Sequence, residues 1–330
     1  MAPAPLPRSR GRGSPRESFP MSSTQPFRGI FAIPVTPFTP DGDLDIPSLR
    51  RCGEFCIQAG AGGVVAPVNA SEFFTLTEGE RKTVVETVVE QTNGRVPVVA
   101  GVSGSSTRVA VEMARHAGRA GADSVMAMPP YVRHPGPDEI VEFYGAVAAA
   151  AGVPVWIQDY VAPMGTPMAP ALLARLLREI PGVEYLKEET ALAPQVMTQV
   201  KSLAGDALKG MMGGMAGRYL LDEYARGACG TMPACEVTDA HVAVWNALES
   251  GDQAESRRLF RELLPLLNIE AMYSFVVYKE VLYRRGIIAC PKSRAPGSPT
   301  LDETASRELD LILTDLAPLL TAKIPATVGV

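Results

Sequence analysis

Residues 97–130 read PVVAGVSGSSTRVAVEMARHAGRAGADSVMAMPP, and this stretch decides the fold. Short apolar runs at Pro97–Ser103 and Ser124–Pro129 flank a segment, Thr107–Ala120, whose apolar residues recur with the period of a helix. A serine before that segment and a glycine after it are typical helix boundaries. A strand, a helix and a second strand in this order predict a βαβ unit with parallel strands.

The same unit recurs along the chain from Gly29 onward. The other strand candidates are Gly29–Phe38, Gly63–Asn69, Pro154–Tyr160, Val183–Glu189, Ala207–Gly213 and Cys229–Ala234. The other helix candidates between them are Ile46–Ala59, Glu78–Gln91, Pro137–Ala151, Pro170–Ile180, Leu192–Leu203 and Arg218–Arg226. Eight strands with intervening helices predict an α/β fold of the (β/α)8 TIM-barrel type.

Further helical segments follow the eighth strand, at Thr238–Glu249, Gln253–Leu267, Ala271–Arg285 and Thr304–Ala322. One of them closes the barrel, and the others form a C-terminal helical extension. We therefore expect a disordered, Pro- and Arg-rich N-terminal extension over 1–26, the barrel over 27–250 and the helical extension over 251–330. An open, doubly wound sheet is the alternative, but it would carry a glycine-rich phosphate turn after its first strand, and 36–40 reads TPFTP.

Composition excludes several classes of protein. The formal net charge is -5 and charges of both signs are interspersed, so nucleic acid is not an expected partner. No run of about 18 uncharged apolar residues occurs, so we expect a soluble protein without membrane contact. The five cysteines form no C-x-x-C pair and are too few for a disulfide framework, which predicts a reduced, cytoplasmic protein.

The sixth strand carries the most informative side chain. It reads VEYLKEET over 183–190 and places Lys187 near its carboxyl end, where barrel enzymes hold their reactive groups. By the two-residue period, Tyr185 and Glu189 share the face of Lys187. An amine in such a partly desolvated site becomes nucleophilic toward a carbonyl, which predicts Schiff-base chemistry. The alternative is a rim lysine that only pairs with a neighbouring glutamate.

Two other sets of residues compete less well. Lys209 stands in the amino-terminal half of the seventh strand, the face of a barrel that serves stability. The three histidines, His116, His134 and His241, show neither an H-x-H nor an H-E-x-x-H pattern. We expect no metal and no cofactor.

Several motifs together resemble the family of lysine-dependent aldolases and dehydratases that includes dihydrodipicolinate synthase and N-acetylneuraminate lyase. The resemblance covers about residues 27–320 and rests on GIFAIPVTPF at 29–38, DG at 41–42, SE at 71–72, LT at 76–77, ER at 80–81, MPPY at 128–131 and LKE at 186–188. It implies a barrel with a C-terminal helical extension, a Schiff base on Lys187 and a homodimer or homotetramer.

The loop after the second strand departs from the family pattern. In the family it typically reads Gly-Thr-Thr-Gly-Glu and binds the substrate carboxylate, whereas this chain has VNASE at 68–72. A short amide, a hydroxyl and backbone N–H groups can still hold a carboxylate. The resemblance thus assigns substrate binding to Asn69, Ala70 and Ser71.

The fifth strand departs as well, since the family's proton-relaying tyrosine sits in a Tyr-Asn-x-Pro run and this chain reads PVWIQDYVAP over 154–163. If Pro154 sets the register, Gln158 takes the tyrosine's position; if Pro163 does, Tyr160 keeps the role. We favour Gln158, because a one-residue slip would turn the side chains to the other face. The arginine that often follows in members with a dicarboxylic partner is missing.

The remaining runs, GGMAG at 213–217 and RGACGTMP at 226–233, resemble the branch that dehydrates 2-keto-3-deoxy sugar acids such as 2-keto-3-deoxypentonate. We expect Lys187 as nucleophile, Tyr131 and one of Gln158 or Tyr160 in proton transfer, and Gly213 and Gly214 beside the substrate. The alternatives are an aldolase, a condensing enzyme of the 4-hydroxy-tetrahydrodipicolinate synthase type that uses pyruvate, or an inactive protein that only binds 2-keto acids.

Overall fold

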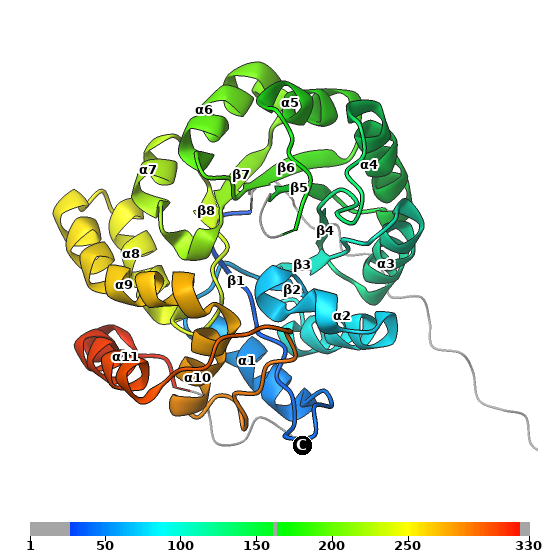
Figure 1. The fold of residues 1–330 in the computed structure, drawn as a ribbon. Coiled ribbons are helices and arrows are strands. Elements are labelled where there is room, and N and C mark those ends of the chain that lie inside the picture. The colour runs from blue at the N-terminus through cyan, green and yellow to red at the C-terminus, as the bar shows by residue number, and fades with distance from the viewer. Residues whose placement is uncertain (1–26, 161–163, 324–330) are drawn as a thin grey trace, which may run out of the picture.

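Eight parallel strands close into a barrel in a computed structural model that describes residues 27–160 and 164–323 (Figure 1). The strands are β1 Gly29–Ala32, β2 Gly63–Ala66, β3 Val98–Gly101, β4 Ser124–Ala127, β5 Val155–Asp159, β6 Val183–Glu188, β7 Gly210–Gly213 and β8 Gly230–Thr231. Each strand pairs with its neighbour in the sequence, and β8 returns to β1. The predicted (β/α)8 fold is confirmed.

Helices surround the barrel. They are α1 Ile46–Gln58, α2 Glu78–Thr92, α3 Thr107–Ala120, α4 Pro137–Ala151, α5 Pro170–Glu179, α6 Ala193–Ala204, α7 Leu220–Ala225 and α8 Thr238–Glu249. Local chemistry fixes many of their ends: Thr77 and Glu80 form a capping box at the start of α2, and Gly121 ends α3 with φ +94°.

Three longer helices follow the barrel: α9 Gln253–Tyr273, α10 Phe275–Arg284 and α11 Glu303–Leu316. They share an apolar core of Leu263, Val277 and Leu309 with residues after β8. The segment after α10 returns to the barrel, where Ile287 packs with residues of α1. Figure 1 shows α10 lying beside α1.

Aromatic side chains fill the barrel toward the amino-terminal ends of its strands. Trp156 and Tyr185 face inward from β5 and β6 and stack with ring centroids 4.5 Å apart. Phe27 covers Tyr185 edge-on at 5.1 Å and also contacts Phe31. This packing closes the amino-terminal end of the barrel, so open space remains only toward the carboxyl ends of the strands.

Several strands end earlier than the sequence predicts. β1 stops at Ala32, and residues 33–38 keep only the single bridges Ile33 to Ala234 and Phe38 to Leu44. β2 stops at Ala66, and Asn69, the last residue of the expected strand, begins a turn of 3-10 helix over Asn69–Ser71. Prolines at 34, 37 and 67 lack the N–H that a strand ladder needs, which accounts for both early ends.

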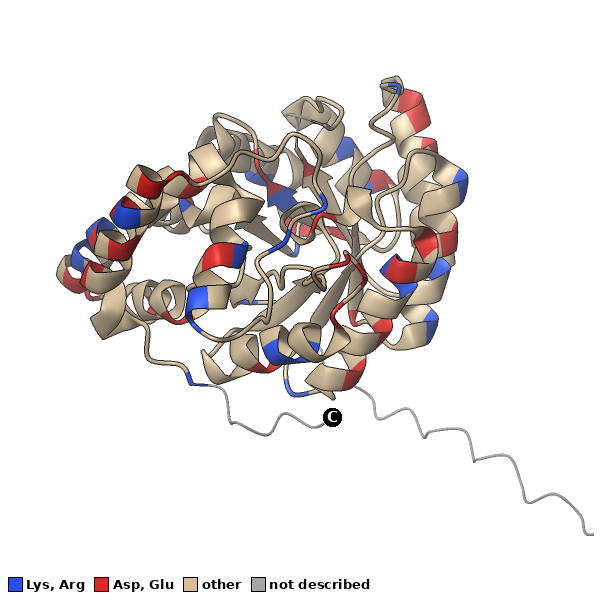
Figure 2. Ribbon diagram, turned by 60° about the horizontal axis from the view of Figure 1, so that its bottom comes forward, with Lys and Arg blue, Asp and Glu red and all other residues tan. Residues whose placement is uncertain are grey.

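Helix bounds agree more closely, with α3, α4 and α8 at their predicted residues, while α9 runs on to Tyr273 through Pro265. The predicted extension over 1–26 lies outside the described residues. Acidic and basic residues are interspersed along the helices in Figure 2. Among the described helices, none combines the length and the apolar character needed to cross a bilayer.

Candidate active site

A cavity of about 220 Å³ opens at the carboxyl ends of the strands. Its lining comes from the loops after β1, β2, β5, β7 and β8, from β6, and from the junction of α9 and α10. Drug-sized ligands occupy pockets of roughly 300–1,000 Å³, so this cavity suits a smaller molecule. Lys187 lies in its wall.

Lys187 is held by β6 and by two polar neighbours. Its side chain is almost fully buried, and its Nζ lies 3.0 Å from Oε2 of Glu189. The same oxygen accepts a hydrogen bond of 2.7 Å from Nε2 of Gln158. Amine, carboxylate and amide therefore form one connected group at the cavity. Lys209, in contrast, precedes β7 and donates to the carbonyl of Asp206.

The pleat of two paired strands explains this grouping. Gln158 of β5 and Lys187 of β6 are register partners one layer above the stacked Trp156 and Tyr185, so both face the lumen. Gln158 therefore lies level with the lysine, and its place as the counterpart of the family tyrosine stays a prediction. Pro163, the other possible marker, lies outside the described residues.

Tyr160 nevertheless also lines the cavity. Burial, with a smaller effect of the nearby Glu189, raises the pKa of the Tyr160 hydroxyl to about 12. The phenol therefore keeps its proton at neutral pH and can act as a hydrogen-bond donor. Of the two strand-five candidates, Tyr160 lines the cavity, and Gln158 contacts it through Glu189.

The loop after β2 divides its three candidate residues between two positions. Asn69 and Ala70 line the cavity, and the amide nitrogen and oxygen of Asn69 are buried with no hydrogen-bond partner in the described chain. The hydroxyl of Ser71, which the sequence led us to expect on a carboxylate, donates instead to the carbonyl of Pro34 at 2.7 Å. Asn69 therefore offers free hydrogen-bonding groups to a ligand, and Ser71 ties the loop to the segment after β1.

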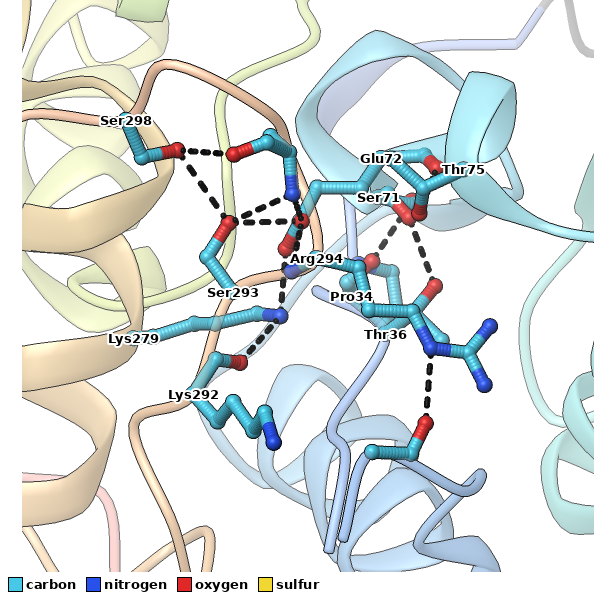
Figure 3. Close-up of polar contacts among 12 residues, drawn as sticks. Pro34, Thr36, Ser71, Glu72, Thr75, Lys279, Lys292, Ser293, Arg294 and Ser298 are labelled. Atoms are coloured by element: carbon cyan, nitrogen blue, oxygen red, sulfur yellow. Dashed lines mark hydrogen bonds and ion pairs between the residues drawn. The ribbon is translucent and has the colours of Figure 1, made fainter. Parts of the chain in front are cut away.

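A buried ion pair fixes the end of this loop (Figure 3). Glu72 has a left-handed backbone with φ 54°, and its carboxylate contacts Nζ of Lys279 on α10, both side chains being fully buried. The hydroxyl of Ser293 and the backbone N–H groups of Arg294 and Ala295 donate to the same carboxylate at 2.7–2.9 Å. The C-terminal segment thus holds the loop that carries Asn69.

Tyr131 packs against the loop after β2. Its ring lies edge-on against Phe73 with centroids 6.0 Å apart, and it is not among the residues that line the cavity of Lys187. Burial raises the pKa of its hydroxyl, and the nearby Arg81 opposes that shift. A role of Tyr131 in proton transfer stays a prediction.

Two glycines after β7 make room for carboxylates. A Cβ on Gly214 would come within 2.2 Å of Oε1 of Glu189, and a Cβ on Gly213 within 1.9 Å of Oε2 of Glu223. Any side chain at 214 would push Glu189 away from the lysine. Neither glycine lines the cavity, so their position supports packing of acidic side chains, not contact with a substrate tail.

A row of buried carboxyl groups lies on the outer side of the same strands. Asp159 and Glu188 are register partners that face the helix layer, and Glu188 accepts from the N–H of Thr190 at 2.9 Å. Burial, reinforced by the other carboxylates, raises the pKa of Asp159, of Glu188 and of Glu223, that of Glu223 to about 8. Neighbouring buried carboxyl groups stay partly protonated, because several negative charges cannot be held together without water.

Some lining residues were not selected from the sequence. Glu189 had a signal, since it shares a face with Lys187 by the two-residue period. Arg218, Ser274 and Tyr278 had none, because they come from segments distant from the strand of the lysine.

Comparison with known proteins places this geometry in context. Residues 26–315 match the Dihydrodipicolinate synthetase family. The chain is 36% identical to an L-2-keto-3-deoxyarabonate dehydratase of Azospirillum brasilense over 90% of this chain and 97% of the relative. It is 32% identical to a 4-hydroxy-tetrahydrodipicolinate synthase of Methanothrix thermoacetophila over 89% of this chain and 98% of the relative. A crystal structure of dihydrodipicolinate synthase from Rhodopseudomonas palustris superposes with a TM-score of 0.81 at 28% identity, covering 88% of this chain and 97% of that one.

Breaking the Glu72–Lys279 pair should destabilise the protein by about 3 kcal/mol, since removing one partner leaves the other as an uncompensated buried charge. Glu72→Gln should cost more than Lys279→Met. In Lys279→Met, the remaining Glu72 would keep three other hydrogen-bond donors. In Glu72→Gln, the remaining Lys279 would keep only the carbonyl of Lys292 and the ring of Phe38. The double variant should recover part of the lost stability, as measured by thermal or urea unfolding. Strictly additive losses would mean that the two groups are not coupled.

Glu223→Gln should raise stability at alkaline pH. The folded-state pKa of Glu223, about 8, lies above the ordinary value near 4.3, so the stability from its protonated form is complete below about pH 4 and is lost as pH rises through 8. The variant should therefore exceed the wild type by on the order of 2 kcal/mol at pH 8, and by less at pH 5, in urea unfolding. Glu142→Gln, at an exposed position of α4, is the control and should show a pH-independent difference. An equally flat difference for Glu223→Gln would contradict the shift.

Proposed function

The chain belongs to the dihydrodipicolinate synthetase family of lyases, and from this premise we propose that it dehydrates a 2-keto-3-deoxy sugar acid through a Schiff base on Lys187. A 2-keto-3-deoxypentonate is the proposed substrate class. The relative that is named an L-2-keto-3-deoxyarabonate dehydratase supports this choice, because it is similar along nearly its whole length.

The observation that carries the proposal is the contact between Lys187 and Glu189 inside the cavity. A primary amine in such a site is a nucleophile for a keto carbon. The carboxylate of Glu189 lies 3.0 Å from that amine. It can exchange protons with the amine and with atoms bonded to the keto carbon that the amine attacks. The amide of Gln158 holds the carboxylate in place.

Substrate binding follows from the groups around the lysine. The free amide of Asn69 and the backbone beside Ala70 would hold the substrate carboxylate, with the keto carbon at Nζ of Lys187. Ser71 would act indirectly, by keeping the loop on the carbonyl of Pro34. Tyr160 would donate a hydrogen bond from its protonated hydroxyl.

The first half of the reaction forms the iminium. A proton moves from the Lys187 ammonium to Glu189, and the free amine adds to the keto carbon to give a carbinolamine. Glu189 then returns its proton to the carbinolamine hydroxyl, which leaves as water. The product of this half is a protonated iminium, with Glu189 again a carboxylate.

The second half removes the substrate hydroxyl. The iminium acidifies the neighbouring carbon, whose proton passes to Glu189 and leaves an enamine. The electron pair of the enamine expels the hydroxyl from the next carbon, and that hydroxyl takes the proton of Glu189 to leave as water. Hydrolysis of the carbon–nitrogen bond consumes one water and restores Lys187, so the net change is the loss of one water.

A condensing synthase is the second candidate, favoured by the relatives of that name. It shares every step up to the enamine, which would then attack an aldehyde. Glu189 favours dehydration, because expulsion of a hydroxyl needs an acid beside the lysine. Cytoplasmic location stays a prediction from the cysteine content, and assembly into a dimer or tetramer stays a prediction of the family resemblance.

Borohydride reduction in the presence of pyruvate should add a stable adduct to Lys187, because the imine is trapped as an amine. Peptide mass spectrometry locates the adduct. Lys187→Ala should carry none, and Lys209→Ala, which removes a lysine at the other end of the barrel, should carry it like the wild type. Folded protein without any adduct, with pyruvate and with a 2-keto-3-deoxypentonate, would favour a protein that only binds keto acids.

Glu189→Gln should lower the rate of 2-keto-3-deoxypentonate dehydration by about 100-fold or more, because general acid–base catalysis contributes on the order of 10²–10⁴. Formation of the dehydrated keto acid measures the rate. The adduct with pyruvate should still form on longer incubation, since the nucleophile remains. Glu184→Gln, near the start of β6, is the matched control. Wild-type turnover by Glu189→Gln would remove Glu189 from the mechanism.

A further inference from the structure

A second part of the cavity wall comes from outside the βα units that hold Lys187. Arg218 stands after the short turn that follows β7, and Ser274 and Tyr278 stand where α9 meets α10. All three line the cavity of Lys187. The mechanism above uses none of them, although a sugar acid extends beyond its keto carbon and needs partners for its remaining hydroxyls.

Arg218 is held in a fixed orientation. One of its terminal nitrogens donates to the carbonyl of Leu267 on α9. This is the only hydrogen bond from its guanidinium within the described part of the chain, so its other N–H groups remain available to a ligand.

The other two residues present hydroxyl groups. Ser274 has φ 48° and ψ -124°, an uncommon conformation for a residue with a side chain, and this break between the helices brings Ser274 to the cavity. Tyr278, one turn later on α10, lines the same cavity. Burial raises the pKa of the Tyr278 hydroxyl, which therefore remains protonated and can donate.

We propose that Arg218, Ser274 and Tyr278 form a subsite for the neutral, hydroxylated end of the keto acid. The inference rests on the proposed function and extends it to the far end of the substrate. Hydroxyl groups of the substrate can accept from Arg218 and exchange hydrogen bonds with Ser274 and Tyr278.

A truncated and a complete substrate distinguish effects on this subsite from effects on the lysine. Pyruvate has no distal hydroxyl, so its borohydride adduct reports only on Lys187 and its neighbours. Tyr278→Phe and Ser274→Gly each remove one hydroxyl, and glycine suits the backbone of Ser274. Each should lower kcat/KM for a 2-keto-3-deoxypentonate by about fivefold to tenfold, the effect of one lost hydrogen bond. The rate of pyruvate trapping should change less than twofold.

Tyr283→Phe is the matched control, since it removes a tyrosine hydroxyl from an exposed position on the same helix and should change neither quantity. Equal losses with pyruvate and with the sugar acid, or no loss with either, would overturn the subsite. Failure of the wild type to form any adduct would instead refute the proposed function, so the two failures can be told apart.

Discussion

Side chains alternate between the lumen and the helix layer along each strand of the barrel, and the chemistry of this protein depends on that alternation in β5 and β6. Gln158 and Lys187 share a register and face inward, while their neighbours Asp159 and Glu188 face outward. A slip of one residue in β6 would turn the amine into the helix layer, and a slip of one residue in β5 would turn Gln158 away from the amine. The stacked rings of Trp156 and Tyr185 below them oppose such a slip, because they fill the lumen in only one register.

The site also depends on segments that follow the barrel in the sequence. Lys279 and the backbone after Arg294 hold Glu72, which ends the loop that carries Asn69. Ser274 and Tyr278, from the same helices, line the cavity itself. The C-terminal helices are therefore part of the site, since they position the loop that carries Asn69 and supply the part of the cavity wall formed by Ser274 and Tyr278.

Buried acidic groups recur around the cavity, and each is accommodated in its own way. Glu72 is neutralised by Lys279, and Glu189 by Lys187. Glu223 has no such partner, so burial raises its pKa, and Gly213 leaves the space that its carboxyl group occupies. Of these groups only Glu189 reaches both the cavity and the lysine, which is why the mechanism assigns the proton transfers to it.

The sequence by itself determined the eight βα units, most helix bounds and the place of Lys187 at the carboxyl end of a strand. Each of these follows from local periodicity, caps and turn residues, which act over a few positions. It also indicated that Glu189 shares the face of the lysine. Only the tertiary structure decided that the hydroxyl of Ser71 binds the carbonyl of Pro34 and that Tyr131 does not line the cavity. The same holds for Arg218, Ser274 and Tyr278, because contacts between distant segments depend on how the barrel closes and leave no periodic signal in the chain.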